Sequence, residues 1–124
     1  MRGGLLVAIG VGAIGGALLR FWAQRQFNLS TLSPLGTFLV NMVGAFVLGI
    51  LTALFDKESE EYIFYGLSTG FCGSLTTFSS ITLEVFEMLR LEKFWQAALY
   101  LSLTIVLGVM ILGGGYWIGN HLRG

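Results

Sequence analysis

The sequence predicts an all-α membrane protein with four transmembrane helices, the third of which is broken near the middle of the membrane. Three observations lead to this fold class. Only 11% of the 124 residues are charged and 55% are hydrophobic, whereas a soluble domain carries about 25% charged residues. Four apolar segments follow one another, and the third contains a run of glycine, serine and threonine. The chain length fits a single domain of four such helices.

The residue inventory argues against nucleic-acid binding, metal clusters and enzyme chemistry. The 7 basic and 7 acidic residues balance, so no net charge attracts nucleic acid. Cys72 and His121 are the only residues of their kinds, which excludes an internal disulfide and a cysteine metal cluster. We therefore predict a multi-pass protein of the cell membrane that is not an enzyme. The first apolar segment, although Arg2 precedes it, is expected to be a retained span rather than a signal peptide.

The four spans are expected at regular intervals along the chain. The first runs from about Gly3 to Trp22, and the second runs from about Leu35 to Phe55 without a charge. The third runs from about Tyr62 to Arg90, and the fourth from about Phe94 to Ile118, again without a charge. A helix of about 20 apolar residues crosses the hydrocarbon, so each segment is long enough. The connections are short, and both ends of the chain are expected on the same side.

The third span is unusual in its length and in its middle. At about 29 residues it is too long for a straight crossing, and residues 70–80 read GFCGSLTTFSS. Non-helical backbone at membrane depth is tolerated only where protein or a water-filled cavity surrounds it. Two helical pieces joined at Gly73 to Thr77 explain both features, and such a break exposes backbone carbonyls that can coordinate ions.

Helically spaced glycines predict closely packed helices. The chain has 18 glycines, and pairs four residues apart let helix backbones approach closely in lipid. Such pairs are Gly12 and Gly16, Gly66 and Gly70, and Gly115 and Gly119. Their density predicts tight assembly with a partner, because four short helices enclose almost no interior.

Basic residues are nearly balanced between the two ends of the predicted bundle. One end has Arg2, Lys57 and Arg123, and the other has Arg25, Arg90 and Lys93, together with Arg20 if its side chain snorkels outward. The bias of lysine and arginine in short loops sets the topology of a membrane protein. We therefore hypothesise that the chain inserts in both orientations and forms antiparallel pairs.

Polar side chains within the spans are candidates for a functional site. Thr37 and Asn41 share one helix face in the second span, and Tyr100 and Thr104 share one in the fourth. For Asn41, a hydrogen bond between helices is the alternative to a lining role. Tyr100 lies about two turns inside its span, which favours a lining role over an interfacial anchor.

The third span contributes a further polar stripe. Thr76, Ser80 and Glu84 follow one another at four-residue spacing. Glu84 either faces a headgroup or vestibule or pairs with Arg20 inside the assembly, and the sequence leaves both readings open.

The intramembrane groups are mostly hydroxyls and one amide, which donate hydrogen bonds without fixed negative charge. A path lined in this way suits a small, strongly hydrated anion better than a cation. Phe78 fits such a path, because the edge of an aromatic ring carries the positive end of its quadrupole. An edge-on ring can stabilise an anion without trapping it, and conduction requires that the ion can leave.

Three motifs resemble the CrcB/Fluc family of small fluoride channels: GGALLR at residues 15–20, GTFLVN at 36–41 and GFCGSLTTFSS at 70–80. Chain length, span count and motif order agree over nearly the whole chain, and the third motif is the most specific. The resemblance implies a fluoride-selective channel that exports fluoride passively and so relieves its toxicity. It also implies an antiparallel, dual-topology homodimer in the lipid bilayer, with two pores and a central structural sodium ion.

The resemblance further implies roles for individual residues. The sodium ion is expected to bind the backbone carbonyls of Gly73 and Thr76, and Arg20 and Glu84 are expected at the vestibules. The expected pore and fluoride-binding residues are Thr37, Asn41, Phe78, Ser79, Ser80, Tyr100 and Thr104.

Two positions depart from the family pattern. Ile81 stands where the family usually has a second phenylalanine. Isoleucine has no ring quadrupole, so we do not assign the role of a second ring to Ile81. Gly108 stands where a serine is common, and glycine offers no side chain for that hydrogen bond.

Two other classes of function were weighed. The small multidrug exporters are also four-span, dual-topology proteins, but they need a carboxylate in the first span for proton exchange. The first span here has Arg20 and no acid. A non-transporting assembly subunit would explain the glycines but not the polar interruption beside Phe78.

Overall fold

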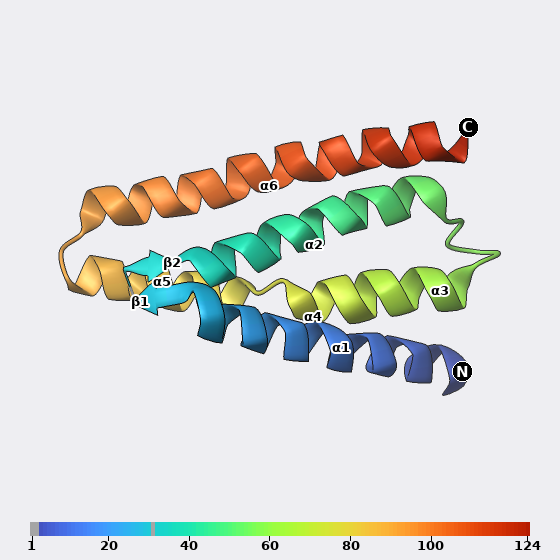
Figure 1. Ribbon diagram of the computed structural model, residues 1–124, viewed down its shortest axis with the longest axis horizontal. Coiled ribbons are helices and arrows are strands. Elements are labelled where there is room, and N and C mark those ends of the chain that lie inside the picture. The colour runs from blue at the N-terminus through green and yellow to red at the C-terminus, as the bar shows by residue number, and fades with distance from the viewer. Residues whose placement is uncertain (1–2, 31) are drawn as a thin grey trace.

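Three long apolar helices make up most of the fold: α1 (Gly3–Phe27), α2 (Leu35–Leu54) and α6 (Phe94–Arg123) (Figure 1). Each is long and apolar enough to cross a membrane. The computed structural model describes residues 3–30 and 32–124. Arg2, which was counted above among the basic residues at one end of the bundle, lies outside the described residues.

The first helix continues beyond its expected end at Trp22 and stops at Phe27. Arg25 lies in its last turn, where a positive charge interacts favourably with the helix dipole. Two short antiparallel strands, β1 (Asn28–Ser30) and β2 (Ser33–Pro34), then lead directly into α2. The connection that was expected to be a loop therefore begins as helix, and it carries polar side chains toward the bundle.

The third apolar segment is helical but interrupted. Its elements are α3 (Glu61–Tyr65), the π-helix η1 (Gly66–Cys72), α4 (Gly73–Leu75) and α5 (Phe78–Arg90). Thr76 has φ −80° and ψ 155°, and Thr77 has φ −149° and ψ 115°, so both residues are extended. The helical backbone therefore continues to Leu75, and the interruption is shorter than the expected joint from Gly73 to Thr77.

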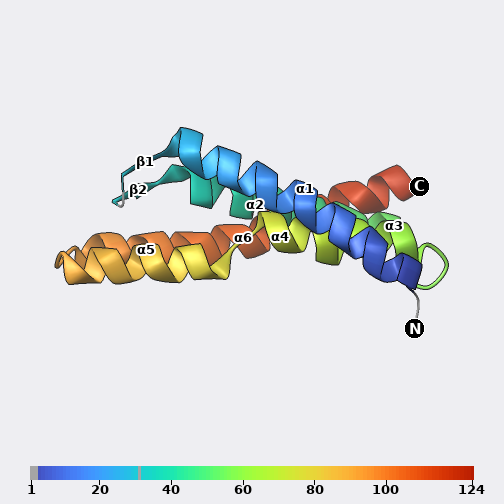
Figure 2. The same ribbon diagram turned by 90° about the horizontal axis from the view of Figure 1, so that it is seen from below.

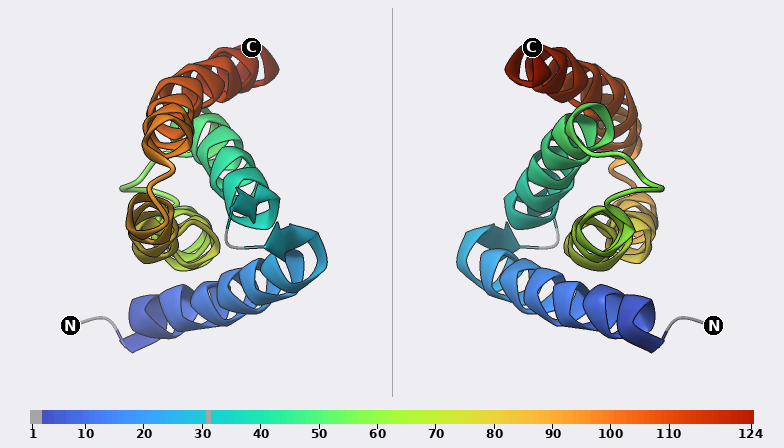
Figure 3. Two further views of the ribbon diagram at one scale, coloured as in Figure 1. Left: turned by 90° about the vertical axis from the view of Figure 1, so that its left-hand side faces the viewer. Right: turned by 90° about the vertical axis from the view of Figure 1, so that its right-hand side faces the viewer.

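The helices run along one another, and the beginning of α1 and the end of α6 lie at the same end of the molecule (Figure 1). Seen end-on, α2 lies between α6 and α1 (Figure 3). The main packing partner of α2 is α6, whereas α1 packs mainly against η1 and α4. Figure 2 shows α1 crossing over α4 close to the interruption.

Glycine allows the close approach of these helices. A Cβ atom on Gly12 would overlap the backbone carbonyl of Gly66, and one on Gly115 would overlap the carbonyl of Phe46. All six glycines of the three pairs named above face another helix of the same chain. These pairs therefore serve packing within the chain, and the partner expected from the density of glycines stays a prediction.

The described chain has little interior of its own. Its largest fully buried side chains are Leu75, Met88 and Thr37, while most large apolar side chains of α1 and α6 are exposed. In water such a surface would be unfavourable, but lipid tails or another protein surface can cover it. Thr37 is notable in this setting, because a polar side chain is completely buried.

Candidate functional site

The interruption in the third segment is tied to α2 by Asn41. The backbone N–H of Thr77 donates to Asn41 Oδ1 at 2.8 Å. The next element is capped locally, because the N–H of Ser80 donates to Thr77 Oγ1 at 3.1 Å. The two N–H groups thus bind side chains and not the carbonyls that they would meet in a continuous α-helix.

Those carbonyls belong to Gly73 and Thr76, the two residues expected to bind sodium. In a continuous α-helix, the carbonyl of residue i accepts from the N–H of residue i+4. The donor for Gly73 would be Thr77, and the donor for Thr76 would be Ser80, but both donors are engaged elsewhere. Two carbonyl oxygens at the interruption are therefore deprived of their helical donors, and oxygen is the ligand type that a hard cation prefers.

A cavity of about 390 Å³ adjoins the interruption. The residues that line it are Asn41, Met42, Ala45, Thr76, Thr77, Phe78, Ile81, Thr104, Ile105, Gly108, Val109 and Leu112. Asn41 Nδ2 and Thr104 Oγ1 are buried, and neither has a hydrogen-bond partner within the described part of the chain. An unpaired buried polar group costs about 1–3 kcal/mol. Two of the residues that line the cavity thus carry a buried polar group without a partner in the described part of the chain.

The two residues at the aromatic positions differ in their surroundings, although both line this cavity. Phe78 is the first residue of α5, and its side chain is 76% exposed. Ile81 is 7% exposed and belongs to the buried core. The Phe78 ring is therefore presented outward from the protomer, while Ile81 fills space within it.

A second polar cluster surrounds the carboxylate of Glu84 on α5. The hydroxyl of Thr37 donates to Glu84 Oε2 at 2.6 Å, and that of Tyr100 donates to Oε1 at 2.7 Å. Asn28 Nδ2 lies 3.3 Å from Oε2. Three neutral donors from β1, α2 and α6 thus converge on one anionic group. This region of the molecule is built to donate hydrogen bonds to negative charge.

Arg20 does not contact this carboxylate, so the pairing with Arg20, one of the two readings of Glu84 left open above, is not found within the protomer. Arg20 Nε donates to the carbonyl of Ser74 at 3.0 Å, and Nη1 lies 3.5 Å from Gln24 Oε1. The guanidinium group instead joins α1 to α4. Ser74 lies in α4, in the last helical turn before the interruption, where backbone carbonyls lack helical donors.

The expected stripe of Thr76, Ser80 and Glu84 is also incorrect. Thr76 precedes α5 and is extended, and its hydroxyl donates to the carbonyl of Cys72 at 2.9 Å. Ser80 and Glu84 both lie on α5. Ser79 is exposed, and its hydroxyl lies 3.2 Å from Thr77 Oγ1.

Residues 7–116 match the model of a protein family described as "CrcB-like protein, Camphor Resistance (CrcB)". The chain belongs to the CrcB family. A relative from Thermococcus onnurineus, named fluoride-specific ion channel FluC, is 36% identical over 98% of this chain and 100% of its own length. A relative of the same name from Acinetobacter baylyi is 37% identical over 94% of this chain and 97% of its own length. A third FluC from Methanococcus maripaludis is 37% identical over 87% and 91% of the two lengths.

These findings confirm the family resemblance that was drawn from the three motifs. All the polar residues described above lie within the range matched to the CrcB family. With three helices that are long and apolar enough to cross a membrane, this CrcB-family chain is a multi-pass integral membrane protein.

Two residues of the CrcB-family chain were missed by sequence reasoning, namely Gln24 and Asn28. The expected end of the first span at Trp22 placed both in a connection. Arg20, Gln24 and Asn28 are spaced four residues apart, so a longer helix would have placed all three side chains on one face. This spacing is the signal that could have found them.

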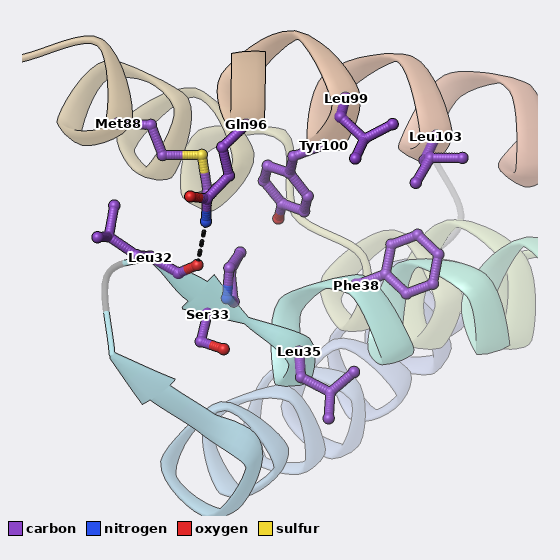
Figure 4. Close-up of a pocket in the computed structure, with 10 residues that line it drawn as sticks. Leu32, Ser33, Leu35, Phe38, Met88, Gln96, Leu99, Tyr100 and Leu103 are labelled. Atoms are coloured by element: carbon purple, nitrogen blue, oxygen red, sulfur yellow. Dashed lines mark hydrogen bonds between the residues drawn. The ribbon is translucent and has the colours of Figure 1, made fainter. Parts of the chain in front are cut away.

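A separate cavity of about 320 Å³ lies behind Tyr100, between β2, α2, α5 and α6 (Figure 4). It is mainly apolar, and Gln96 Nε2 donates to the carbonyl of Leu32 at its edge. The ring of Tyr100 lines this cavity while its hydroxyl binds Glu84. The phenol therefore has an apolar body in the cavity and a polar tip in the Glu84 cluster.

Proposed function

We propose that this CrcB-family protein is a fluoride-selective ion channel through which fluoride leaves the cell passively. The observation that carries the proposal is the cavity at the interruption, where the buried Asn41 and Thr104 have polar groups without partners. The names of the relatives, fluoride-specific ion channel FluC, support fluoride as the transported ion.

The chemistry of the lining supports an anion over a cation. Asn41 and Thr104, which line the cavity, carry an amide and a hydroxyl without partners in the described part of the chain. The groups around Glu84 are hydroxyls and an amide that donate to its carboxylate. Phe78, the first residue of α5, adds an aromatic ring whose edge carries a partial positive charge. These contacts are individually weak, so an ion can exchange its water for protein donors and still leave. Conduction of this kind involves no chemical reaction, so the protein is not an enzyme.

We further propose that the third segment forms a fourth membrane crossing, interrupted near the membrane centre. Its elements α3, η1, α4 and α5 follow one another beside the long helices (Figures 1 and 2). The backbone N–H groups of Thr77 and Ser80 would be acceptable there because the side chains of Asn41 and Thr77 accept from them.

An antiparallel homodimer of dual topology with two pores is the proposed assembly. Three observations support it: the balance of basic residues between the two ends, the outward-facing ring of Phe78 and the extensive exposed apolar surface. A second copy would cover part of that surface. The exposed ring of Phe78 would then face a pore wall supplied by the partner.

We propose that a structural sodium ion joins the two copies. The carbonyls of Gly73 and Thr76 fit such an ion, since their helical donors bind side chains instead. Gly73 is exposed in the protomer, so a second copy could approach it. Carbonyl oxygens from both copies would then supply a set of hard ligands.

Fluoride efflux from liposomes that contain the purified protein tests the proposed function. Release is followed with a fluoride electrode, and chloride is the parallel anion in matched vesicles. We expect rapid fluoride release without chloride release. Fluoride release no faster than from protein-free vesicles, measured on a well-folded dimer, would refute the proposal. In that case the Ile81→Phe variant should be measured next. If that variant also releases no fluoride, the protein shares only its fold with the named relatives.

A further inference from the structure

We propose that Gln24 and Asn28 are positioning residues that make the hydroxyls of Thr37 and Ser80 obligate hydrogen-bond donors, and that they thereby raise selectivity for anions over cations. This inference rests on the proposed function, because it concerns the polarity of groups along the same path. It concerns two amides on α1 and β1 rather than the groups that would meet the ion.

The orientation of both amides is set by partners that can only donate. The backbone N–H of Thr37 donates to Asn28 Oδ1 at 3.0 Å. The guanidinium group of Arg20 lies 3.5 Å from Gln24 Oε1. Backbone N–H groups and guanidinium groups have no acceptor, so an oxygen must face each of them. The NH₂ group of each amide therefore faces the hydroxyls.

The two NH₂ groups occupy both lone pairs of the Thr37 hydroxyl. Gln24 Nε2 and Asn28 Nδ2 each lie 3.1 Å from Thr37 Oγ1. A hydroxyl oxygen has two lone pairs and one proton. Once both lone pairs accept, only the proton remains, and Thr37 donates it to Glu84 Oε2 at 2.6 Å. Thr37 is completely buried, so no bulk water competes for these positions.

The Ser80 hydroxyl also accepts two hydrogen bonds. It accepts from Gln24 Nε2 at 3.1 Å and from Thr77 Oγ1 at 3.1 Å. Both of its lone pairs are thus occupied, and within the described part of the chain no acceptor is recorded for its proton. Ser80 is half-buried, so this proton is available to an arriving ion. One amide, that of Gln24, thereby orients two hydroxyls on different helices.

This orientation matters because a free hydroxyl does not choose between ions. A serine or threonine that can rotate presents its proton to an anion or its oxygen to a cation. When both lone pairs are occupied, the oxygen can no longer turn toward a cation. The amides therefore close the oxygens of Thr37 and Ser80 to a cation. The Thr37 proton stays with Glu84, so it is the Ser80 proton that remains for an anion.

The test compares ion selectivity in two substitutions at Gln24. Gln24→Met removes both hydrogen bonds from Nε2 without adding charge, so the two hydroxyls can rotate. Gln24→Glu keeps an oxygen for Arg20 but replaces the donor by an acceptor, which reverses the hydroxyls. Gln26→Met and Gln26→Glu are the matched controls, since Gln26 is exposed on the same helix.

The measured quantity is the ratio of fluoride to potassium permeability, taken from reversal potentials in a potassium fluoride gradient across planar bilayers. We expect both Gln24 variants to lower this ratio by about fivefold or more, the factor that corresponds to the loss of one hydrogen bond. The Gln26 variants should keep the ratio of the unmodified protein. A role in packing alone would lower the number of active channels but would not change the ratio.

An unchanged permeability ratio in both Gln24 variants would overturn the inference, even if the total current fell. If the Gln24 variants do not fold, the permeability ratio of the Asn28→Asp variant tests the same inference. It keeps the oxygen that accepts from Thr37 N and removes the donor to Thr37 Oγ1, so an unchanged ratio there would overturn the inference too. Failure of the proposed function is recognised separately, because the unmodified protein would then conduct no fluoride.

Discussion

Asn41 and Thr77 are joined by a hydrogen bond of 2.8 Å that links the middle of α2 to the interruption between α4 and α5. The same asparagine has a buried Nδ2 group without a partner in the described part of the chain. Its oxygen thus holds the backbone in place, while its nitrogen is a buried donor without such a partner, on a residue that lines the cavity. The two ends of this side chain can therefore be tested separately.

Asn41→Asp should abolish fluoride flux while the protein remains a folded dimer. The carboxylate keeps an acceptor for the N–H of Thr77, but it replaces the free donor by negative charge. Burial of that charge has a cost, so some loss of thermal stability is expected. Liposome efflux measures the flux, and gel filtration in detergent measures the dimer.

Asn41→Leu is the complementary control, because it removes the acceptor as well. The N–H of Thr77 is then left unsatisfied, at a cost of about 1–3 kcal/mol, and a lower melting temperature should accompany the loss of flux. Normal fluoride flux in Asn41→Asp would remove Asn41 from the path.

Phe78→Ala should lower fluoride flux with little effect on protomer stability. The ring is 76% exposed in the protomer, so its removal leaves no cavity in the core. Flux is measured by liposome efflux, and folding is measured by thermal melting in detergent. Unchanged efflux in Phe78→Ala would show that the ring has no part in conduction.

Ile81→Phe is expected to behave differently, because Ile81 is only 7% exposed. The larger ring must fit into an occupied space, and overpacking costs about 1–3 kcal/mol. The melting temperature should fall even if the additional ring raises flux. A melting temperature equal to that of the unmodified protein would indicate that the cavity beside Ile81 accepts the ring.

Gly115→Ala should destabilise the protein, whereas Gly113→Ala should not. A Cβ atom on Gly115 would overlap the carbonyl of Phe46, but one on Gly113 meets nothing within 4 Å. The clash separates α2 from α6 and should cost about 1–3 kcal/mol. At Gly113, alanine should stabilise the helix by up to about 1 kcal/mol, because it restricts the unfolded chain. Thermal melts of the two variants make the comparison, and equal effects would argue against tight α2–α6 packing.

Replacement of sodium by a large organic cation should weaken the proposed dimer. N-methyl-D-glucamine is too large to bind between carbonyls, so those of Gly73 and Thr76 would lose their ligand. The fraction of dimer is measured by crosslinking or gel filtration during dilution in detergent, with and without sodium at the same ionic strength. A dimer that is equally stable in both cations would refute the structural role of sodium.

Much of the fold could be predicted from local patterns. The second span was expected at Leu35 to Phe55 and is found as Leu35–Leu54, and the fourth was expected to begin at Phe94, where α6 begins. The first span was predicted to be shorter than it is, because the residues after Trp22 are polar and their hydropathy is typical of a loop. In the structure the helix continues to Phe27. Gln24 on α1 and Asn28 on β1 bind partners on α2 and α5.

The sequence by itself determined that the chain is an apolar, multi-pass helical protein of the CrcB family, and that the stretch around Thr76 and Thr77 departs from a simple span. Composition and motif order are properties of the linear sequence, so they can be determined without coordinates. Only the tertiary structure decided that Arg20 binds Ser74 and not Glu84, and that Asn41 holds Thr77. These pairings join residues far apart in the chain, and their distances follow from how closely the helices approach one another.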